Sequence, residues 1–92
     1  MVKKVNSKKL SDSKKFNVMV YRTQSCPYCH MVEEFLKENK IKYKSIDVGR
    51  DQKAAQEMIQ KSGQMGVPVI DINGKIIVGF DKTALRKTLG IS

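Results

Sequence analysis

The sequence has no tryptophan, a single histidine, two prolines and two cysteines. No apolar run approaches the roughly 20 residues of a membrane-spanning helix, so we expect no membrane span. A closed zinc site with four Cys or His ligands cannot form within one chain, because His30 is the only candidate besides the cysteines. The length of 92 residues suits one domain with a small core. We therefore predict a single small domain and no metal site.

Positive charge predominates, since 18 Lys and Arg against 9 Asp and Glu give a formal net charge of +9. Six lysines and one acid fall within residues 1–15, which we interpret as a basic, disordered N-terminal extension of a domain at 16–92. The extension has no aromatic residue and no helical stripe of apolar residues, so we predict no specific nucleic-acid partner. An electrostatic anchor for nucleic acid or lipid is the alternative. The lysines are not followed by the apolar core of a signal peptide, and we predict a cytoplasmic protein.

Hydrophobic periodicity predicts four strands and three helices. Alternating, β-rich segments predict strands at residues 16–21, 41–48, 67–72 and 75–78. Apolar residues at helical spacing predict helices from 27 to 39, from 49–51 to 62–63, and from Asp81 as N-cap to Gly90. The element order is therefore β-α-β-α-β-β-α.

This order defines an α/β fold with a mixed four-stranded sheet flanked by helices on both faces. A helix between the first two strands makes them parallel through a right-handed crossover. Asn73-Gly74 connects the last two strands and favours a tight hairpin, because both residues tolerate positive φ. Met31, Phe35, Met58 and Leu85 lie at helical spacings, and we expect them on the core faces of their helices.

Cys26-Pro27-Tyr28-Cys29 follows the first predicted strand and opens the first predicted helix. Amides at a helix N-terminus stabilise a thiolate, which lowers the pKa of Cys26. Two intervening residues bring the sulfurs within bonding distance, so Cys29 can attack a mixed disulfide formed on Cys26. A reducing cytoplasm disfavours a purely structural disulfide. The motif thus predicts redox chemistry with a reversible Cys26–Cys29 disulfide.

Two further residues near this motif need an interpretation. Pro68 begins a predicted buried strand, where a residue without an N–H is tolerated, and we expect a cis bond after Val67. His30 adjoins Cys29, but consecutive helical residues point in different directions. We predict a surface histidine without a catalytic role.

Three segments resemble the signature segments of glutaredoxins: Cys26-Pro27-Tyr28-Cys29, residues 62–68 and Val78-Gly79-Phe80-Asp81. The resemblance extends from residue 16 to about residue 90 and implies a thioredoxin-like fold with thiol–disulfide oxidoreductase activity. It implies that Val67, before Pro68, presents its backbone N–H and C=O to an extended disulfide substrate. It also implies that Gly79, Phe80 and Asp81 bind the γ-glutamyl end of glutathione through backbone amides.

The sequence departs from the family pattern at the cations that hold glutathione's glycyl carboxylate. Thr23 stands where the family often has lysine, and Met65-Gly66 stands where an arginine often precedes Thr-Val-Pro. Lys82 replaces the second acid of the third segment. Arg22 and Lys82 are the candidates to substitute for these missing cations. Tyr28, Thr23 and Gln64 are further candidates for contact with substrate or glutathione. Phe80 replaces a small polar residue and suits a protein substrate.

The resemblance implies partners but leaves the electron donor open. Expected partners are proteins that contain disulfides, with either glutathione or thioredoxin reductase as the source of electrons. No tightly bound cofactor is expected, and a monomer is the default. An alternative of another class is an iron–sulfur or metal carrier that uses Cys26 across a dimer. The Pro-Tyr pair between the cysteines resembles the redox-active subgroup more than the cluster-binding one.

Overall fold

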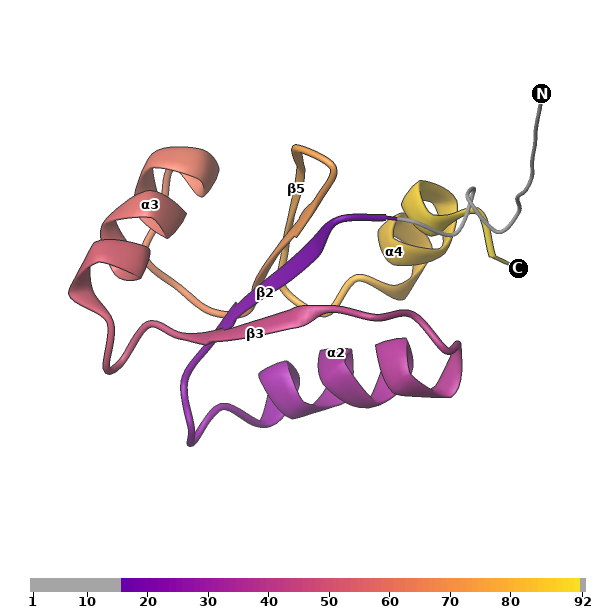
Figure 1. Ribbon diagram of the computed structural model, residues 1–92, viewed down its shortest axis with the longest axis horizontal. Coiled ribbons are helices and arrows are strands. Elements are labelled where there is room, and N and C mark those ends of the chain that lie inside the picture. The colour runs from indigo at the N-terminus through magenta and orange to yellow at the C-terminus, as the bar shows by residue number, and fades with distance from the viewer. Residues whose placement is uncertain (1–15, 92) are drawn as a thin grey trace, which may run out of the picture.

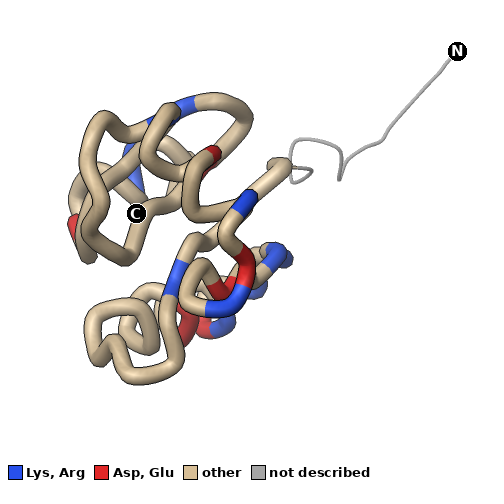
Figure 2. The backbone as a smooth tube through the Cα atoms, turned by 90° about the vertical axis from the view of Figure 1, so that its left-hand side faces the viewer, with Lys and Arg blue, Asp and Glu red and all other residues tan. Residues whose placement is uncertain are grey.

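The computed structural model describes residues 16–91, and the predicted basic extension at 1–15 lies outside the described residues. The elements, in the predicted order, are β2 (Val18–Arg22), α2 (Pro27–Glu38), β3 (Lys44–Asp47), α3 (Gln52–Ser62), β4 (Val69–Ile72), β5 (Lys75–Val78) and α4 (Lys82–Leu89) (Figure 1). Basic and acidic residues are interspersed along this part of the chain (Figure 2). None of its helices is both long and apolar enough to span a membrane.

The four strands form one mixed sheet in the order β3-β2-β4-β5. Strands β2 and β3 are parallel, whereas β4 is antiparallel to both β2 and β5. In the β2–β4 pair, Tyr21 lies opposite Val69, so the end of β2 lies beside the start of β4. This register brings the segment after β2, with both cysteines, close to the segment before β4, with Pro68.

Three strands are shorter than predicted, whereas β5 has the predicted bounds of 75–78. The predicted strand at 41–48 begins only at Lys44, because the Ile41 N–H donates to the Leu36 carbonyl at 2.9 Å and closes the end of α2. The strand predicted from Val67 begins at Val69, since Pro68 has no N–H for a ladder. The first strand runs from Val18 to Arg22 rather than over 16–21.

The helix ends agree with the capping residues of the sequence. Asp51 and Asp81 are the N-caps of α3 and α4, and each carboxylate accepts a backbone N–H at 3.1 Å. Gly63 and Gly90 end these helices with φ of 74° and 71°, a left-handed conformation that favours glycine. Asn39 is the C-cap of α2 and not its last helical residue.

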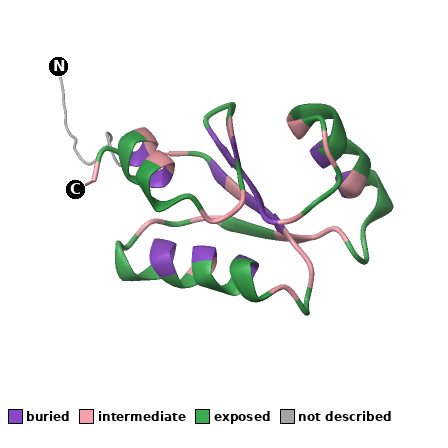
Figure 3. Ribbon diagram, turned by 180° about the vertical axis from the view of Figure 1, so that it is seen from behind, coloured by how far each residue is buried: buried purple, intermediate pink, exposed green. Residues whose placement is uncertain are grey.

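The core has two layers, one on each face of the sheet (Figure 3). Because successive strand residues point to opposite faces, Val18 and Val20 face α2 and α4, whereas Tyr21 faces α3. The first layer consists of Val18, Val20, Val32, Phe35, Leu36, Ile70, Ile72, Ile77, Leu85 and Leu89. Each buried side chain of this size contributes about 1.5–3 kcal/mol relative to exposure, so the packing fixes α2 on the sheet.

A polar cluster ties α3 to the sheet on the other face. The Lys61 ammonium donates to the Tyr21 hydroxyl and to one Asp71 carboxylate oxygen, each at 2.8 Å. The second oxygen of Asp71 accepts the Gly74 N–H at 2.8 Å in the β4–β5 turn. Asp71 is the one charged residue buried in the described core, and Lys61 supplies its counter-charge. We call these three side chains, Tyr21, Lys61 and Asp71, the α3 brace.

Candidate active site

The two cysteines lie at the N-terminus of α2, as the sequence predicts. Cys26 is the N-cap with extended backbone, and Pro27 is the first helical residue, where its missing N–H has no helical partner to lose. The Cys26 Sγ accepts the Cys29 N–H at 3.1 Å. The Cα atoms are 5.2 Å apart and a disulfide joins the two sulfurs. The Cys26 sulfur therefore occupies the position where helical amides stabilise negative charge.

Burial distinguishes the two cysteines. Cys29, in the first turn of α2, is fully buried at 0 % exposure, whereas Cys26 is partly exposed. Beside them the Tyr28 side chain is 62 % exposed. Of the two cysteines, Cys26 is therefore the one that a disulfide in solvent can reach. Tyr28 offers an aromatic edge next to it.

The segment before β4 has the cis Val67–Pro68 bond that the sequence predicts. The Pro68 carbonyl accepts the Gly79 N–H at 2.9 Å, which joins this segment to the one before α4. Val67 is half-buried and Pro68 is buried. The three segments of the resemblance thus lie at the same end of the sheet, where β2 and β5 end and β4 begins.

Gln64, a candidate ligand contact in the sequence, folds back onto its own loop. Its side-chain amide accepts the Gly66 N–H at 2.8 Å and donates to the Gly66 carbonyl at 2.9 Å. A Cβ on residue 66 would lie 2.9 Å from the Gln64 Oε1, so glycine fits this arrangement. Gln64 therefore positions the backbone that leads into Val67.

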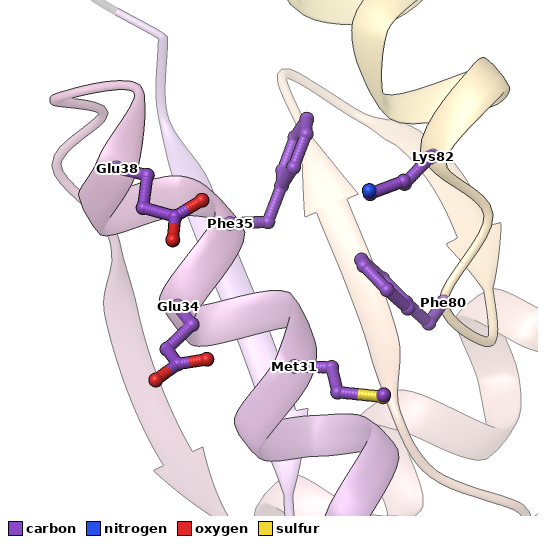
Figure 4. A pocket seen from close by; sticks show the side chains of 6 residues that line it. All are labelled: Met31, Glu34, Phe35, Glu38, Phe80 and Lys82. Carbon is purple, nitrogen blue, oxygen red and sulfur yellow. The ribbon is translucent and has the colours of Figure 1, made fainter.

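The Gly79–Asp81 segment enters α4 and contacts α2. Gly79 has φ of 83°, and the Asp81 carboxylate caps the helix through the Ala84 N–H. The Phe80 ring packs edge-on against Phe35 of α2, with centroids 6.2 Å apart. A pocket of about 190 Å³ lies between these two elements, lined by Met31, Glu34, Phe35, Glu38, Phe80 and Lys82 (Figure 4).

Arg22, a predicted substitute for the missing cations, pairs with Glu33 of α2. Its Nε lies 2.9 Å from a Glu33 carboxylate oxygen, and both side chains are mostly buried. Glu33 also accepts hydrogen bonds from the Tyr43 and Ser45 hydroxyls, at 3.2 and 3.0 Å. Burial, and then the charge and hydrogen bond of Glu33, raise the pKa of Tyr43 above its ordinary value. Glu33 thus ties α2 to Arg22 at the end of β2 and to Ser45 in β3.

The other predicted cation and the threonine lie on different sides of the site. The Lys82 ammonium is 6.0 Å from the Phe80 ring centroid, on the α4 side. Thr23 lines a separate hollow of about 170 Å³ together with Gln24, Asp47, Gly49 and Arg50. The analysis of the sequence missed Arg50, because only the folded chain brings the loop after β3 beside the loop after β2.

Met31 corrects one prediction about the core. Phe35, Met58 and Leu85 are buried as expected, but Met31 is 46 % exposed. Its place in the helix explains this, because it precedes the buried Val32 and lies about 100° around the helix from it. Met31 instead lines the pocket beside Phe80.

His30 is exposed, and its Nε2 lies 3.2 Å from the Gln24 carbonyl oxygen. This agrees with the predicted surface position of the side chain. Within residues 16–91 no group of three or more His, Cys, Asp and Glu side chains is placed to hold a metal ion.

The arrangement defines the class of protein. A mixed four-stranded sheet with three helices, and a Cys-x-x-Cys pair at the N-terminus of a helix beside a cis-proline segment, is the thioredoxin-like fold with a dithiol site. Residues 18–77 match the model of the family described as Glutaredoxin. The chain belongs to the glutaredoxin family and is a thiol–disulfide oxidoreductase.

Relatives and solved structures agree with this assignment. A glutaredoxin-like 8.6 kDa protein in the rubredoxin operon of Clostridium pasteurianum is 42 % identical over 72 residues, covering 78 % of this chain and 96 % of the relative. Glutaredoxin 3 of Escherichia coli K12 is 32 % identical over 65 residues, covering 71 % and 78 %. The crystal structure of the thioredoxin-like protein BC3987 superposes with a TM-score of 0.74 at 30 % identity, covering 78 % and 99 %.

Proposed function

We propose that the protein reduces disulfides by a dithiol mechanism in which Cys26 is the attacking thiolate and Cys29 the resolving thiol. The observation that carries this assignment is the difference in burial between the two cysteine residues. Cys26 is partly exposed at the N-terminus of α2, while Cys29 is fully buried behind it. A nucleophile has to meet its substrate, whereas a resolving thiol needs only to reach the sulfur of its neighbour.

The first step transfers the substrate's sulfur to the protein. The Cys26 thiolate attacks one sulfur of the substrate disulfide, and a new S–S bond forms as the old one breaks. The other substrate sulfur leaves as a thiolate and takes up a proton from solvent. The Cys29 N–H that bonds the Cys26 Sγ at 3.1 Å stabilises the attacking charge.

The second step releases the reduced substrate. Cys29 loses its proton and attacks the Cys26 sulfur, which expels the remaining substrate sulfur as a thiolate that is then protonated. Two electrons have passed to the substrate, and the protein is left with the Cys26–Cys29 disulfide. With the disulfide formed, the two Cα atoms are 5.2 Å apart, within the usual range for disulfides.

Substrate would lie across the end of the sheet where the three segments meet. Val67 would pair its backbone N–H and C=O with an extended substrate before Pro68, and Tyr28 would pack against it. The backbone amides of Gly79, Phe80 and Asp81 would hold the γ-glutamyl carboxylate of glutathione. The join between Pro68 and Gly79, at 2.9 Å, supports a single continuous site.

Glutathione is the proposed electron donor. The proposed form of the protein is a cytoplasmic monomer without a tightly bound cofactor. Because Arg22 pairs with Glu33, it is not free to replace one of the family's missing cations in binding glutathione. A lost charge-assisted hydrogen bond of about 1.5–3 kcal/mol weakens the hold on glutathione about tenfold to a hundredfold. The same ion pair favours a second candidate, a protein disulfide reductase that takes electrons from thioredoxin reductase.

Turnover of hydroxyethyl disulfide with each electron source tests these candidates. Glutathione, glutathione reductase and NADPH form one assay, and thioredoxin reductase with NADPH forms the other. We expect turnover with glutathione at a raised KM. Turnover with thioredoxin reductase alone replaces this proposal with the second candidate, and inactivity in both assays contradicts both.

A gained cation provides a matched test of the glutathione site. Thr23→Lys restores the family's lysine beside the site, and we expect the KM for glutathione to fall by about fivefold to tenfold with kcat little changed. Gln24→Lys is the control, since it adds the same charge on the adjacent exposed residue. An equal fall in KM for both variants would show general charge attraction rather than a defined glutathione site.

A further inference from the structure

An apolar stripe leads away from the dithiol along α2. Tyr28, Met31 and Phe35 follow one another at spacings of three and four residues, which places them on one side of the helix. Tyr28 and Met31 are 62 % and 46 % exposed, although both side chains are large and apolar over most of their surface. Phe80 faces the stripe from the α4 side (Figure 4). Met31, Phe35 and Phe80 line the pocket between α2 and α4, and Tyr28 lies one helical turn before Met31, on the cysteine side. We call this apolar surface the groove.

The groove has an acidic rim on α2. Glu34 and Glu38 are one helical turn apart, both are exposed, and both line the pocket on its α2 side (Figure 4). Neither takes part in a salt bridge within residues 16–91. The cation of the pocket, Lys82, comes from the opposite wall and lies near the Phe80 ring. The α2 rim therefore offers negative charge in a protein whose net charge is +9.

We propose that this groove binds a segment of the disulfide-containing protein substrate, with an apolar side chain on Met31, Phe35 and Phe80 and a basic residue on Glu34 and Glu38. The inference rests on the proposed function and names the class of substrate for the same site. Charge complementarity selects the occupant, because two carboxylates on one rim attract Lys or Arg and repel Asp or Glu. Glutathione carries a net negative charge, which the two carboxylates of the rim repel.

The positions of Met31, Glu34 and Glu38 along α2 determine which residues of the substrate segment they would contact. A helix rises about 1.5 Å per residue, so Met31 lies roughly 7 Å along the axis from Cys26, and Glu34 and Glu38 lie roughly 12–18 Å along it. An extended substrate covers about 3.3 Å per residue. The apolar residue should therefore stand about two positions, and the basic residue about four or five positions, from the substrate cysteine.

The test uses the full chain in its reduced form and short synthetic peptides. Each peptide contains one cysteine joined by a disulfide to thionitrobenzoate, a leucine two positions away, and either lysine or glutamate four positions away. Both chain directions are made, and the faster one is used. Attack by Cys26 on the peptide sulfur forms the mixed disulfide and releases coloured thionitrobenzoate, so a rate constant is measured without any electron donor.

We expect the lysine peptide to react about threefold to tenfold faster than the glutamate peptide at low salt, with the ratio falling as salt screens the charges. Glu34→Gln combined with Glu38→Gln should bring the ratio to about one. Glu57→Gln, which removes an exposed carboxylate from α3 on the other face of the sheet, should leave the preference as in wild type. Replacing the peptide leucine with serine should slow the reaction with wild type.

Equal rates for the two peptides with wild type would overturn the inference, as would a preference that survives the double substitution. Those outcomes leave the proposed function intact, since thionitrobenzoate is still released. Failure of the proposed function looks different: no peptide releases thionitrobenzoate with wild type, or release continues in Cys26→Ser.

Discussion

Replacing Cys26 with serine removes disulfide reduction down to the uncatalysed background, a loss of about a thousandfold or more. A serine hydroxyl cannot form or exchange an S–S bond, and the remaining sulfur, on Cys29, is fully buried. Cys29→Ser behaves differently, because Cys26 keeps its position at the N-terminus of α2 and still attacks the substrate. Without a resolving thiol, the protein accumulates as a mixed disulfide with the substrate.

Mass spectrometry of each variant after mixing with a peptide disulfide measures this difference directly. Cys29→Ser should gain the mass of one peptide chain, and dithiothreitol should remove it, whereas Cys26→Ser should gain none. Ser25→Ala serves as the control, since it changes an exposed neighbour without touching either sulfur. If instead Cys26→Ser traps the peptide and Cys29→Ser does not, the two roles are reversed.

With glutathione present, the Cys29→Ser variant also separates two routes. A second glutathione molecule can release the product from the Cys26 mixed disulfide, so turnover that persists in this variant indicates a monothiol route. Turnover that stops indicates that Cys29 is required in every cycle. Both outcomes are compatible with the proposal that Cys26 is the attacking sulfur.

The parts of the fold predicted correctly depend on residues close together in the sequence. The N-cap at Asp81, the hairpin turn at Asn73-Gly74 and the start of α2 at Pro27 are all determined by neighbouring residues in the sequence. The predicted ends of the strands were wrong, because a strand extends only as far as its hydrogen bonds to a neighbouring strand. Lys44 to Asp47 pair with β2, whereas Ile41 bonds back to α2, and the alternation of apolar residues does not record that difference.

The candidate site divides in the same way. The position of Cys26 and Cys29 at the start of α2 follows from a motif of four residues. Which residues meet across the site depends instead on contacts between segments that are distant in the sequence. Arg22 pairs with Glu33, and Gln64 folds onto Gly66 rather than facing a ligand. Met31 has the helical spacing of a core residue, but it lies about 100° around the helix from the buried Val32 and is 46 % exposed.

We expect a single substitution in the α3 brace to lower the stability of the fold. Lys61→Met removes the ammonium that bonds Asp71 and Tyr21 while keeping the apolar stem of the side chain. Asp71, whose side chain is 8 % exposed, is then left buried without its counter-charge. Breaking a fully buried pair costs about 3–5 kcal/mol. Since the Lys61 side chain is 32 % exposed, we expect a loss of about 1–3 kcal/mol in the free energy of unfolding.

The brace also predicts how this loss depends on pH. The hydrogen bond to Asp71, and then the one to Tyr21, raise the pKa of Lys61 above its ordinary value of 10.5. A group whose pKa is higher in the folded state holds its proton more tightly there, so its contribution is complete below the ordinary value. That contribution is lost as the pH rises through the folded pKa. The difference between wild type and Lys61→Met should therefore be constant near neutral pH and shrink above pH 10.5.

Urea unfolding of both proteins, followed by circular dichroism at neutral pH and at a pH above 10.5, measures the two free energies. Lys53→Met on the exposed side of the same helix is the matched control, and we expect it to change stability by less than about 0.5 kcal/mol. A loss in Lys53→Met as large as that in Lys61→Met would assign the effect to the helix rather than to the brace. A difference between wild type and Lys61→Met that stays the same at both pH values would show that the Lys61 charge does not stabilise the fold.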